Sequence, residues 1–202
     1  MKTQTHPPEN LVFELRSIVE PLALAGLFQK PQPLEVELGC GDASFLVEHA
    51  RCHPQQNYIG VERLLGRIQK LDRKGRRAGL ANLRGVRIES SYFLQYLLPP
   101  HAASALHIYF PDPWPKKKHR RLRLINESFA ALARAALAPG GVVYLRTDHA
   151  EYFQQMQEVF GAAKEFKSVE TPSSLAEMVT DFEREFNAQG IPTLRAAYRK
   201  HK

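Results

Sequence analysis

The chain has 202 residues, 44% of them hydrophobic and 24% charged, which fits one soluble globular domain with a sizeable core. Its formal net charge of +7 favours a polyanionic partner or an anionic surface. The two cysteines, Cys40 and Cys52, lack CxxC spacing, which argues against a disulfide scaffold or a cysteine-rich zinc site. The first residues contain no long apolar run, so we expect no signal peptide, no membrane span and a cytoplasmic protein. The sequence predicts no metal site.

Apolar runs and breakers predict a leader followed by an α/β domain. Residues 1–33 read as a leader, partly helical from about Glu9 and ended by the proline-rich "KPQP", and residues 34–202 read as one domain. Strands are expected at 34–38, 58–62, 82–89, 105–110, 142–147 and 165–170, with one more in the segment 173–202. Helices are expected at 43–50, 63–79, 91–98, 123–137 and 149–160, and "PGG" breaks the chain after the fourth of them. This alternation predicts βαβ units and a mostly parallel sheet with helices on both faces, although it does not give the strand order.

Polar residues follow the predicted strands at their carboxyl ends. The turn "GCGD" follows the first strand, Glu62 ends the second, Glu89 ends the third, Asp112 follows the fourth and Asp148 follows the fifth. Ligands of open parallel sheets bind at this edge. We therefore expect these side chains to surround one site.

The glycine turn indicates an adenosine cofactor. Gly39 and Gly41 allow the backbone to turn tightly and to approach a ligand, and Glu62 lies roughly 20 residues on, where a carboxylate can hold ribose hydroxyls. A dinucleotide and S-adenosylmethionine both suit this pattern. The alternative is that the glycines only shape a tight turn while Glu62 pairs locally, since a lone G-x-G is a weak signal.

Three further residues favour S-adenosylmethionine over a dinucleotide. Ser44 stands where the dinucleotide pattern has its third glycine, and Asp42 sits at the helix N-terminus that would receive a pyrophosphate. Glu37, just before the turn, can face a cationic sulfonium or amino group, which a dinucleotide lacks.

The stretch "FPDPWPKKKHRR" predicts a rigid loop followed by positive charge. Its three prolines exclude a helix or a central strand and hold Asp112 and Trp114 in place. The basic residues that follow are Lys116, Lys117, Lys118, Arg120, Arg121 and Arg123, which we expect to face outward. A second basic segment, residues 63–87, has nine Lys or Arg against one Asp. Both segments favour a phosphate-rich partner, whereas the alternative for each is a solvated surface.

The motifs together resemble those of a known family. "FPDPWPKKKHRRLRL" closely resembles the signature loop of the tRNA (guanine-N7-)-methyltransferases of the bacterial TrmB type. "EVELGCGDASFL", "YIGVER" and "NLRGVRIESS" resemble the family's first three motifs, and "GGVVYLRTDHAEYF" and "TDFEREFNAQGIP" resemble the last two. The resemblance covers about residues 34–191, and the proline loop and the "TDFE" tail are its most specific parts.

This resemblance implies a Rossmann-like class I methyltransferase fold in residues 34–202, S-adenosylmethionine as the methyl donor, and a guanine in the variable loop of tRNA as the acceptor. Five residues would bind the cofactor: Glu37, Gly39, Glu62, Glu89 and Asp112. Six would contact the substrate: Lys116, Asp148, Thr180, Asp181, Phe182 and Glu183. The family's third motif usually has Asp-Ala where this chain has Glu89-Ser90, so either residue could make the third cofactor contact.

The chemistry of guanine makes Asp112 the candidate catalytic residue. Guanine N7 carries a lone pair and no proton, so methyl transfer needs alignment rather than a general base. A carboxylate can stabilise the positive charge that moves onto the purine. The rival interpretations are a nicotinamide-dependent oxidoreductase, a methyltransferase for another RNA or a small molecule, and a non-catalytic RNA-binding module. The sequence does not predict the oligomeric state.

Overall fold

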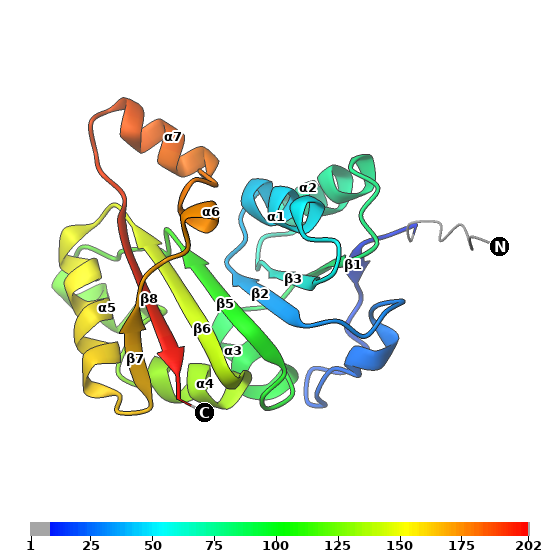
Figure 1. Cartoon of the computed structure of the whole chain (residues 1–202), viewed down its shortest axis with the longest axis horizontal. Coiled ribbons are helices and arrows are strands. Elements are labelled where there is room, and N and C mark those ends of the chain that lie inside the picture. The colour runs from blue at the N-terminus through cyan, green and yellow to red at the C-terminus, as the bar shows by residue number, and fades with distance from the viewer. Residues whose placement is uncertain (1–8, 202) are drawn as a thin grey trace.

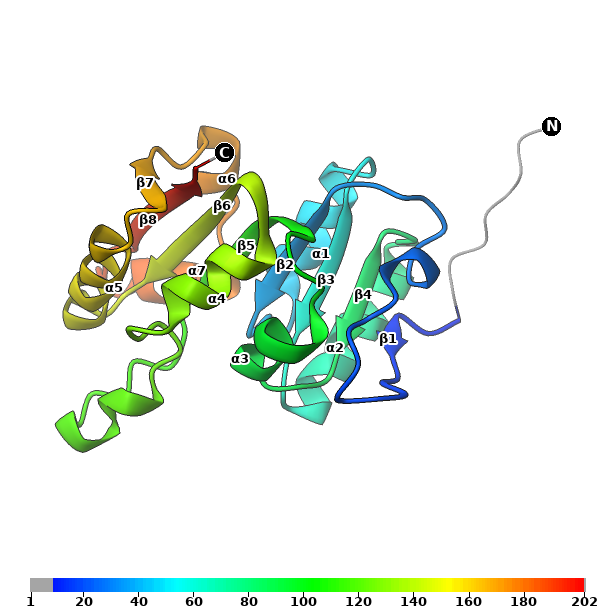
Figure 2. The same cartoon turned by 90° about the horizontal axis from the view of Figure 1, so that it is seen from below.

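The computed structural model describes residues 9–201, which form one eight-stranded sheet (Figures 1 and 2). The strand order is β1-β4-β3-β2-β5-β6-β8-β7, and β8 runs antiparallel to the other strands. The strands are β1 (Val12–Phe13), β2 (Leu34–Leu38), β3 (Asn57–Val61), β4 (Leu83–Val86), β5 (Ala103–Tyr109), β6 (Leu137–Thr147), β7 (Phe166–Val169) and β8 (Leu194–Lys200). The predicted parallel α/β sheet is confirmed, including a last strand in the segment 173–202.

Helices cover both faces of this sheet. One face carries α1 (Ser44–Cys52) and α2 (Leu65–Arg77), while α4 (Phe129–Ala136) and α5 (Ala150–Ala162) lie on the other (Figure 2). The shorter elements are η1 (Leu24–Gly26), α3 (Ser90–Tyr92), a π turn η2 (Phe93–Leu97), a 3-10 helix η3 (Lys117–Leu122), α6 (Ser173–Ala176) and α7 (Asp181–Ala188). No helix within residues 9–201 is long and apolar enough to cross a membrane.

The leader contains less helix than expected. Its described part has only the three-residue η1 and the short strand β1, which pairs with β4 at the sheet edge. Leu11, Leu22 and Leu27 are buried, so the leader packs onto the domain through apolar contacts. Residues 1–8 of the predicted leader and the last residue of the domain lie outside the described residues.

Two further boundaries were predicted wrongly. The helix expected at 123–137 begins only at Phe129, because Arg123 is buried and bonded to the preceding loop. The "PGG" break lies inside β6 rather than between elements, and the pairing of β6 with β5 shifts register there, between Ala103 and Ala105. This irregular pairing, with residues 138–141 of β6 opposite Ser104 of β5, accommodates the proline and glycines that the sequence pattern assigns to a turn.

The functional edge follows from the strand order. The chain runs outward from β2 through β3 to β4, then returns past β2 to form β5 and β6 on its other side. The direction of winding therefore reverses between β2 and β5. Such a reversal opens a crevice at the carboxyl ends of the strands.

Candidate active site

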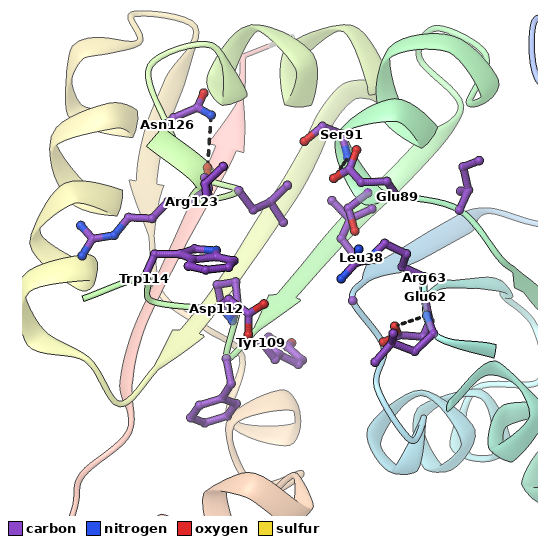
Figure 3. Close-up of a pocket in the computed structure, with 18 of the residues that line it drawn as sticks. Leu38, Glu62, Arg63, Glu89, Ser91, Tyr109, Asp112, Trp114, Arg123 and Asn126 are labelled. Atoms are coloured by element: carbon purple, nitrogen blue, oxygen red, sulfur yellow. Dashed lines mark hydrogen bonds between the residues drawn. The ribbon is translucent and has the colours of Figure 1, made fainter. Parts of the chain in front are cut away.

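A pocket of about 430 Å³ lies at the carboxyl ends of β2 to β5, a suitable size for a small-molecule ligand (Figure 3). Glu62 and Glu89 lie on one side of it, and Tyr109, Asp112 and Trp114 lie on the other. The other lining residues are Leu38, Gly39, Arg63, Leu64, Arg67, Ile88, Ser90, Ser91, Phe110, Pro111, Arg121, Leu122, Arg123, Leu124 and Asn126. Gly39 of the glycine turn, the strand-end carboxylates Glu62 and Glu89, and the proline loop thus meet at one pocket, whereas Asp148, expected at the same site, does not line it.

The glycine turn bends sharply into the pocket. Gly39 and Gly41 have φ of 72° and 54°, in the left-handed region that glycine adopts without strain. The amides of Gly39 and Cys40 both donate to the carbonyl of Val61, which ties the turn to the end of β3. A Cβ added at Gly39 would meet no atom within 4 Å, so this glycine leaves open space in the pocket wall. A ligand can therefore approach the backbone at Gly39.

Glu62 and Glu89 are held by backbone amides. Gly41 N donates to Glu62 Oε2 at 3.1 Å, and Leu64 N donates to Glu62 Oε1 at 2.8 Å. Glu89 caps the short α3, accepting from the amides of Ser91 at 2.9 Å and Tyr92 at 2.8 Å. Each carboxylate oxygen accepts one N–H and keeps further acceptor capacity for a ligand. Ser90 lies beside Glu89 in the pocket wall.

Glu37 is placed differently from these two carboxylates. Its side chain is buried behind the pocket lining, and Oε2 has no hydrogen-bond partner among the described residues. Burial raises the pKa of Glu37 well above its ordinary value; Arg146 opposes this shift, and the carboxylates of Asp42 and Glu62 add to it. A buried carboxyl oxygen without a partner is costly, so it fits a cationic group that is supplied by a ligand.

The proline loop, residues 110–116, presents Asp112 at the pocket rim. Asp112 is exposed and makes no hydrogen bond or ion pair with the described residues. Phe110 and Trp114 have φ of 51° and 41°, a left-handed conformation that bulky residues rarely adopt. Both precede a proline, which disfavours the ordinary α conformation at these positions. Strained backbone of this kind collects at functional sites, which supports a role for the loop.

Trp114 is half-buried and faces the pocket from this loop (Figure 3). Its indole ring meets the imidazole of His119 edge-on, with ring centres 5.8 Å apart. Trp114 thus packs against His119 and also lines the pocket.

The basic run after the loop does not all face outward. Lys116, Lys117, Lys118 and Arg121 are exposed, as predicted. Arg123 is buried, which corrects the prediction for this residue. Its guanidinium donates to the carbonyl of Pro113 at 2.7 Å, pairs with Glu151 at 3.1 Å and lies over the ring of Tyr152. Arg123 therefore holds the proline loop in place instead of presenting charge to a partner.

A buried ion network holds the C-terminal segment against the sheet. Glu183 is fully buried, and its two oxygens pair with Arg146 Nη1 at 2.6 Å and Arg195 Nη2 at 2.7 Å. Arg146 also donates to the carbonyls of Leu175 and Met178. Thr180 and Glu183 form a capping box that starts α7. The Glu183 carboxylate is thus occupied by protein groups in this conformation.

The remaining predicted substrate residues lie around the same edge. Ser44 Oγ donates to Asp181 Oδ2 at 2.5 Å, which joins the start of α7 to the start of α1. Phe182 is 46% exposed, and its ring packs against Phe110 of the proline loop, with ring centres 6.2 Å apart. Asp148 directly follows β6 and is half-buried, without a hydrogen bond among the described residues. Neither Asp148 nor Lys116 lines the pocket, so both lie outside its wall.

Sequence reasoning missed the residues that support the site. Arg146 contacts the tail and also lies over the ring of Tyr109, at 4.3 Å from the ring centre. A charged residue inside the apolar run "VVYLRT" is the signal that could have identified it, because a buried arginine needs several partners. Tyr109 itself reads as an ordinary strand residue, and only the fold places it in the pocket.

Comparison with known proteins identifies the class first. The structure resembles the crystal structure of the 16S rRNA methyltransferase KamB, with a TM-score of 0.62, 16% identity, and coverage of 89% of this chain and 93% of that one. TrmN from Thermus thermophilus gives a TM-score of 0.59 at 17% identity over 85% of this chain and 45% of that one. These likenesses show the fold, which is that of the class I S-adenosylmethionine-dependent methyltransferases.

Sequence comparison then gives the family. Residues 31–196 match a family described as "Putative methyltransferase". The curated tRNA (guanine-N(7)-)-methyltransferase of Geobacter metallireducens is 36% identical over 75% of this chain and 72% of its own length, and that of Treponema pallidum is 33% identical over 91% and 80%. The chain belongs to the tRNA (guanine-N7-)-methyltransferase family. Against the relative from Chromohalobacter salexigens, 36% identical over 75% of this chain, the match spans 62% of the relative's length.

Proposed function

We propose that this chain transfers a methyl group from S-adenosylmethionine to N7 of a guanine in the variable loop of tRNA. The observation that carries the proposal is the position of Asp112. Its carboxylate is unpaired among the described residues, stands at the rim of the cofactor-sized pocket, and is followed within a few residues by exposed cations. The enzyme would work in the cytoplasm, where tRNA is found and where thiols such as those of the free Cys40 and Cys52 stay reduced.

The residues of the pocket fit S-adenosylmethionine. Glu62 would hold the ribose hydroxyls, and Glu89 or Ser90 would contact the adenine edge. Leu64 and Ile88 add apolar surface to the same wall, which suits a flat ring. Glu37 would face the cationic end of the cofactor, beside the open space at Gly39. When bound, S-adenosylmethionine supplies an electrophilic methyl group on a positively charged sulfur.

Asp112 would act on the guanine side of the pocket. Guanine N7 needs no deprotonation, so the protein has to hold the purine in line and compensate the charge that develops on it. A carboxylate that has no protein partner keeps its acceptor capacity for this task. The prolines and the buried Arg123 hold the loop that carries it, which limits the reorganisation needed for reaction.

The exposed cations would bind the RNA backbone. Lys116, Lys117, Lys118 and Arg121 follow the loop, and α2 adds Arg67, Lys70, Arg73 and Arg77 on its exposed side. Phosphate contacts position a nucleic acid without reading its sequence. These residues would therefore set the register of the tRNA, while groups near the pocket select the guanine.

The C-terminal segment would complete the guanine site. Asp148 and Asp181 carry carboxylates that can accept from the guanine N1–H and amino group, and Phe182 offers an exposed ring next to the proline loop. Thr180 and Glu183 would hold this segment in place rather than contact the guanine. Their side chains form the capping box of α7, and Glu183 also pairs with two arginines. Local opening of the folded tRNA would bring the base within reach.

One experiment tests the proposal as a whole. The purified chain is incubated with methyl-labelled S-adenosylmethionine and bulk tRNA, and the tRNA is digested to nucleosides. We expect label in 7-methylguanosine. Label in another nucleoside would support a tRNA methyltransferase but contradict guanine N7 as the acceptor. Binding of tRNA without any label would favour a non-catalytic RNA-binding module. Calorimetry with S-adenosylhomocysteine and with NAD separates the proposed cofactor from the dinucleotide.

A further inference from the structure

A second polar cluster lies beneath the pocket, between the sheet and α1. Glu35 on β2, His49 on α1 and His107 on β5 meet there, although 72 residues separate the first from the last. Glu35 Oε2 lies 2.9 Å from His49 Nε2 and 2.8 Å from His107 Nε2. The side chains of Glu35, His49 and His107 are 13%, 10% and 1% exposed. None of the roles assigned to the pocket uses these three residues.

The spacing of the three groups matches the coordination sphere of a transition metal. One ligand atom from each residue lies within 4.8 Å of the others. Zinc binds His nitrogen and carboxylate oxygen at about 2.0–2.2 Å, so tetrahedral ligands stand about 3.3 Å apart. The two observed N···O distances, 2.9 and 2.8 Å, would lengthen by less than about half an ångström to reach that value.

The imidazole rings are also oriented suitably. The ring centres of His49 and His107 lie 5.5 Å apart, and two imidazoles on one tetrahedral zinc place their ring centres about 5 Å apart. Aromatic neighbours hold each ring in place. Phe45 stacks on His49 with ring centres 5.2 Å apart, and Tyr144 stacks on His107 at 5.3 Å. Three rigid elements thus present the ligand set before any ion binds.

One of the imidazoles also has a second hydrogen bond of the kind found around protein metals. Tyr109 Oη lies 2.8 Å from His107 Nδ1. A metal-bound histidine normally gives its other ring N–H to an acceptor, which fixes the ring and its tautomer. Because Tyr109 also lines the cofactor pocket, this contact links the cluster to the pocket floor.

We propose that Glu35, His49 and His107 bind one divalent transition-metal ion, with Zn²⁺ the ion that the ligand set fits. Two imidazoles and a carboxylate suit Zn²⁺ and disfavour Mg²⁺, which prefers oxygen ligands. The residual exposure of Glu35 and His49 gives the ion a path to the site. The ion would join β2, β5 and α1 and so stabilise the fold below the pocket. The inference does not depend on the proposed function.

If the cluster holds no metal ion, the same contacts require the hydrogens of the two imidazoles to sit on the other ring nitrogens. Without an ion, Glu35 Oε2 accepts an N–H from each imidazole, so both Nε2 atoms carry a hydrogen. With an ion, both Nε2 atoms are ligands and the hydrogens sit on the Nδ1 atoms. The tautomer of each histidine therefore distinguishes the two interpretations.

The binding test uses the untagged full chain after removal of metals with a chelator. Calorimetric titration with Zn²⁺ should give one ion per chain, and titration with Mg²⁺ should give no binding at this site. The variants Glu35→Gln and His49→Gln should each weaken Zn²⁺ binding by about 100-fold or more, since removing a metal ligand should cost more than removing its outer partner. His53→Gln, a neighbouring histidine outside the ligand set, should bind like the parent chain. Equal Zn²⁺ binding in all four proteins would overturn the site.

A second measurement needs no variant and so remains decisive if a substitution prevents folding. Nitrogen NMR of the histidine rings reports which ring nitrogen carries the hydrogen. On addition of one equivalent of Zn²⁺, His49 and His107 should change from Nε2–H to Nδ1–H, and the melting temperature should rise because the ion binds only the folded state. Retention of Nε2–H on both rings at saturating Zn²⁺ would establish the hydrogen-bonded cluster and overturn the proposal.

Discussion

The two sides of the pocket hold their carboxylates in opposite ways. On the strand-end side, Glu62 and Glu89 each accept two backbone N–H groups, and their own chain fixes them. On the side of the proline loop, Asp112 has no hydrogen-bond partner among the described residues, and the backbone around it is fixed instead. The first arrangement keeps a carboxylate immobile, whereas the second keeps all of its acceptor capacity for a ligand.

The difference has an energetic basis. Phe110 and Trp114 in left-handed backbone cost roughly 1–2 kcal/mol each, and contacts elsewhere must offset that strain. Arg123 provides such contacts by binding the loop carbonyl of Pro113. Glu62 and Glu89, which would only bind the cofactor, need no strained loop, because the ends of their strands already hold them in position. A strained loop with an unpaired carboxylate is better explained by a group that acts on the substrate.

Removing the unpaired carboxylate should therefore have the largest effect on catalysis. We expect Asp112→Ala to lower kcat by about 10²–10³-fold, the reduction typical of removing one electrostatic contact from a transition state. Single-turnover methyl transfer measures the rate, and filter binding should show tRNA affinity close to that of the parent chain. Asp112→Asn keeps the shape and removes the charge, so an equally slow Asn variant would assign the effect to charge. Turnover near the parent rate in both variants would rule out the role given to Asp112.

Breaking the ion network under the tail should be the next largest effect. Arg146→Met leaves Glu183 buried with one partner and removes the donors to the carbonyls of Leu175 and Met178. We expect the free energy of unfolding, measured with urea, to fall by about 3 kcal/mol. The double variant Arg146→Met, Glu183→Gln removes the uncompensated charge and should recover part of that stability.

Arg146→Met also tests whether Glu183 contacts the tRNA directly or only supports the C-terminal segment. If Glu183 acts only through the tail, Arg146→Met should raise KM for tRNA by a larger factor than it weakens the affinity for S-adenosylhomocysteine. A stability decrease below about 0.5 kcal/mol would show that the network does not hold the segment.

A smaller effect is expected on the cofactor side. Glu37→Gln keeps the size of a buried side chain whose Oε2 has no partner among the described residues, and removes the carboxyl group that can ionise opposite a bound cation. We expect the affinity for S-adenosylhomocysteine to fall about tenfold, equivalent to about 1.4 kcal/mol, as measured by calorimetry. Glu48→Gln on α1, where the side chain is 47% exposed and pairs with Arg51, is the matched control and should bind like the parent chain. Unchanged affinity in Glu37→Gln would remove this residue from the cofactor site.

The sequence predicts the features of the site that depend on local signals and misses those that depend on contacts between distant residues. The strand ends were predictable because apolar runs, glycines and the acidic residues after them are local signals, and so was the rigidity of a loop with three prolines. What failed depends on distant contacts: Arg123 looks like one more cation until Glu151 and Tyr152 fold against it. Arg146, the register shift in β6 and the Glu35 cluster likewise need the strand order, which the sequence does not give.

The smallest expected effect concerns the exposed cations beyond the proline loop. Lys117 and Arg121 have no ion pair among the described residues, whereas Arg120 pairs with Glu151 at 2.8 Å. Reversing the charge of Lys117 and Arg121 should weaken tRNA binding several-fold. It should also reduce the slope of log K against log salt by about 1 for each phosphate that the variant no longer neutralises.

The matched control for this variant is Lys164→Glu, an exposed cation in the turn between α5 and β7, at the opposite end of the sheet. This substitution reverses one positive charge, as each change at Lys117 and Arg121 does, but it lies far from the proline loop. The slope of log K against log salt for tRNA binding should therefore equal that of the parent chain. Equal slopes in all three proteins would mean that the run after the loop is a solvated surface. In that case the proline loop would act through Asp112 alone, and α2 would be the remaining candidate for the phosphate contacts.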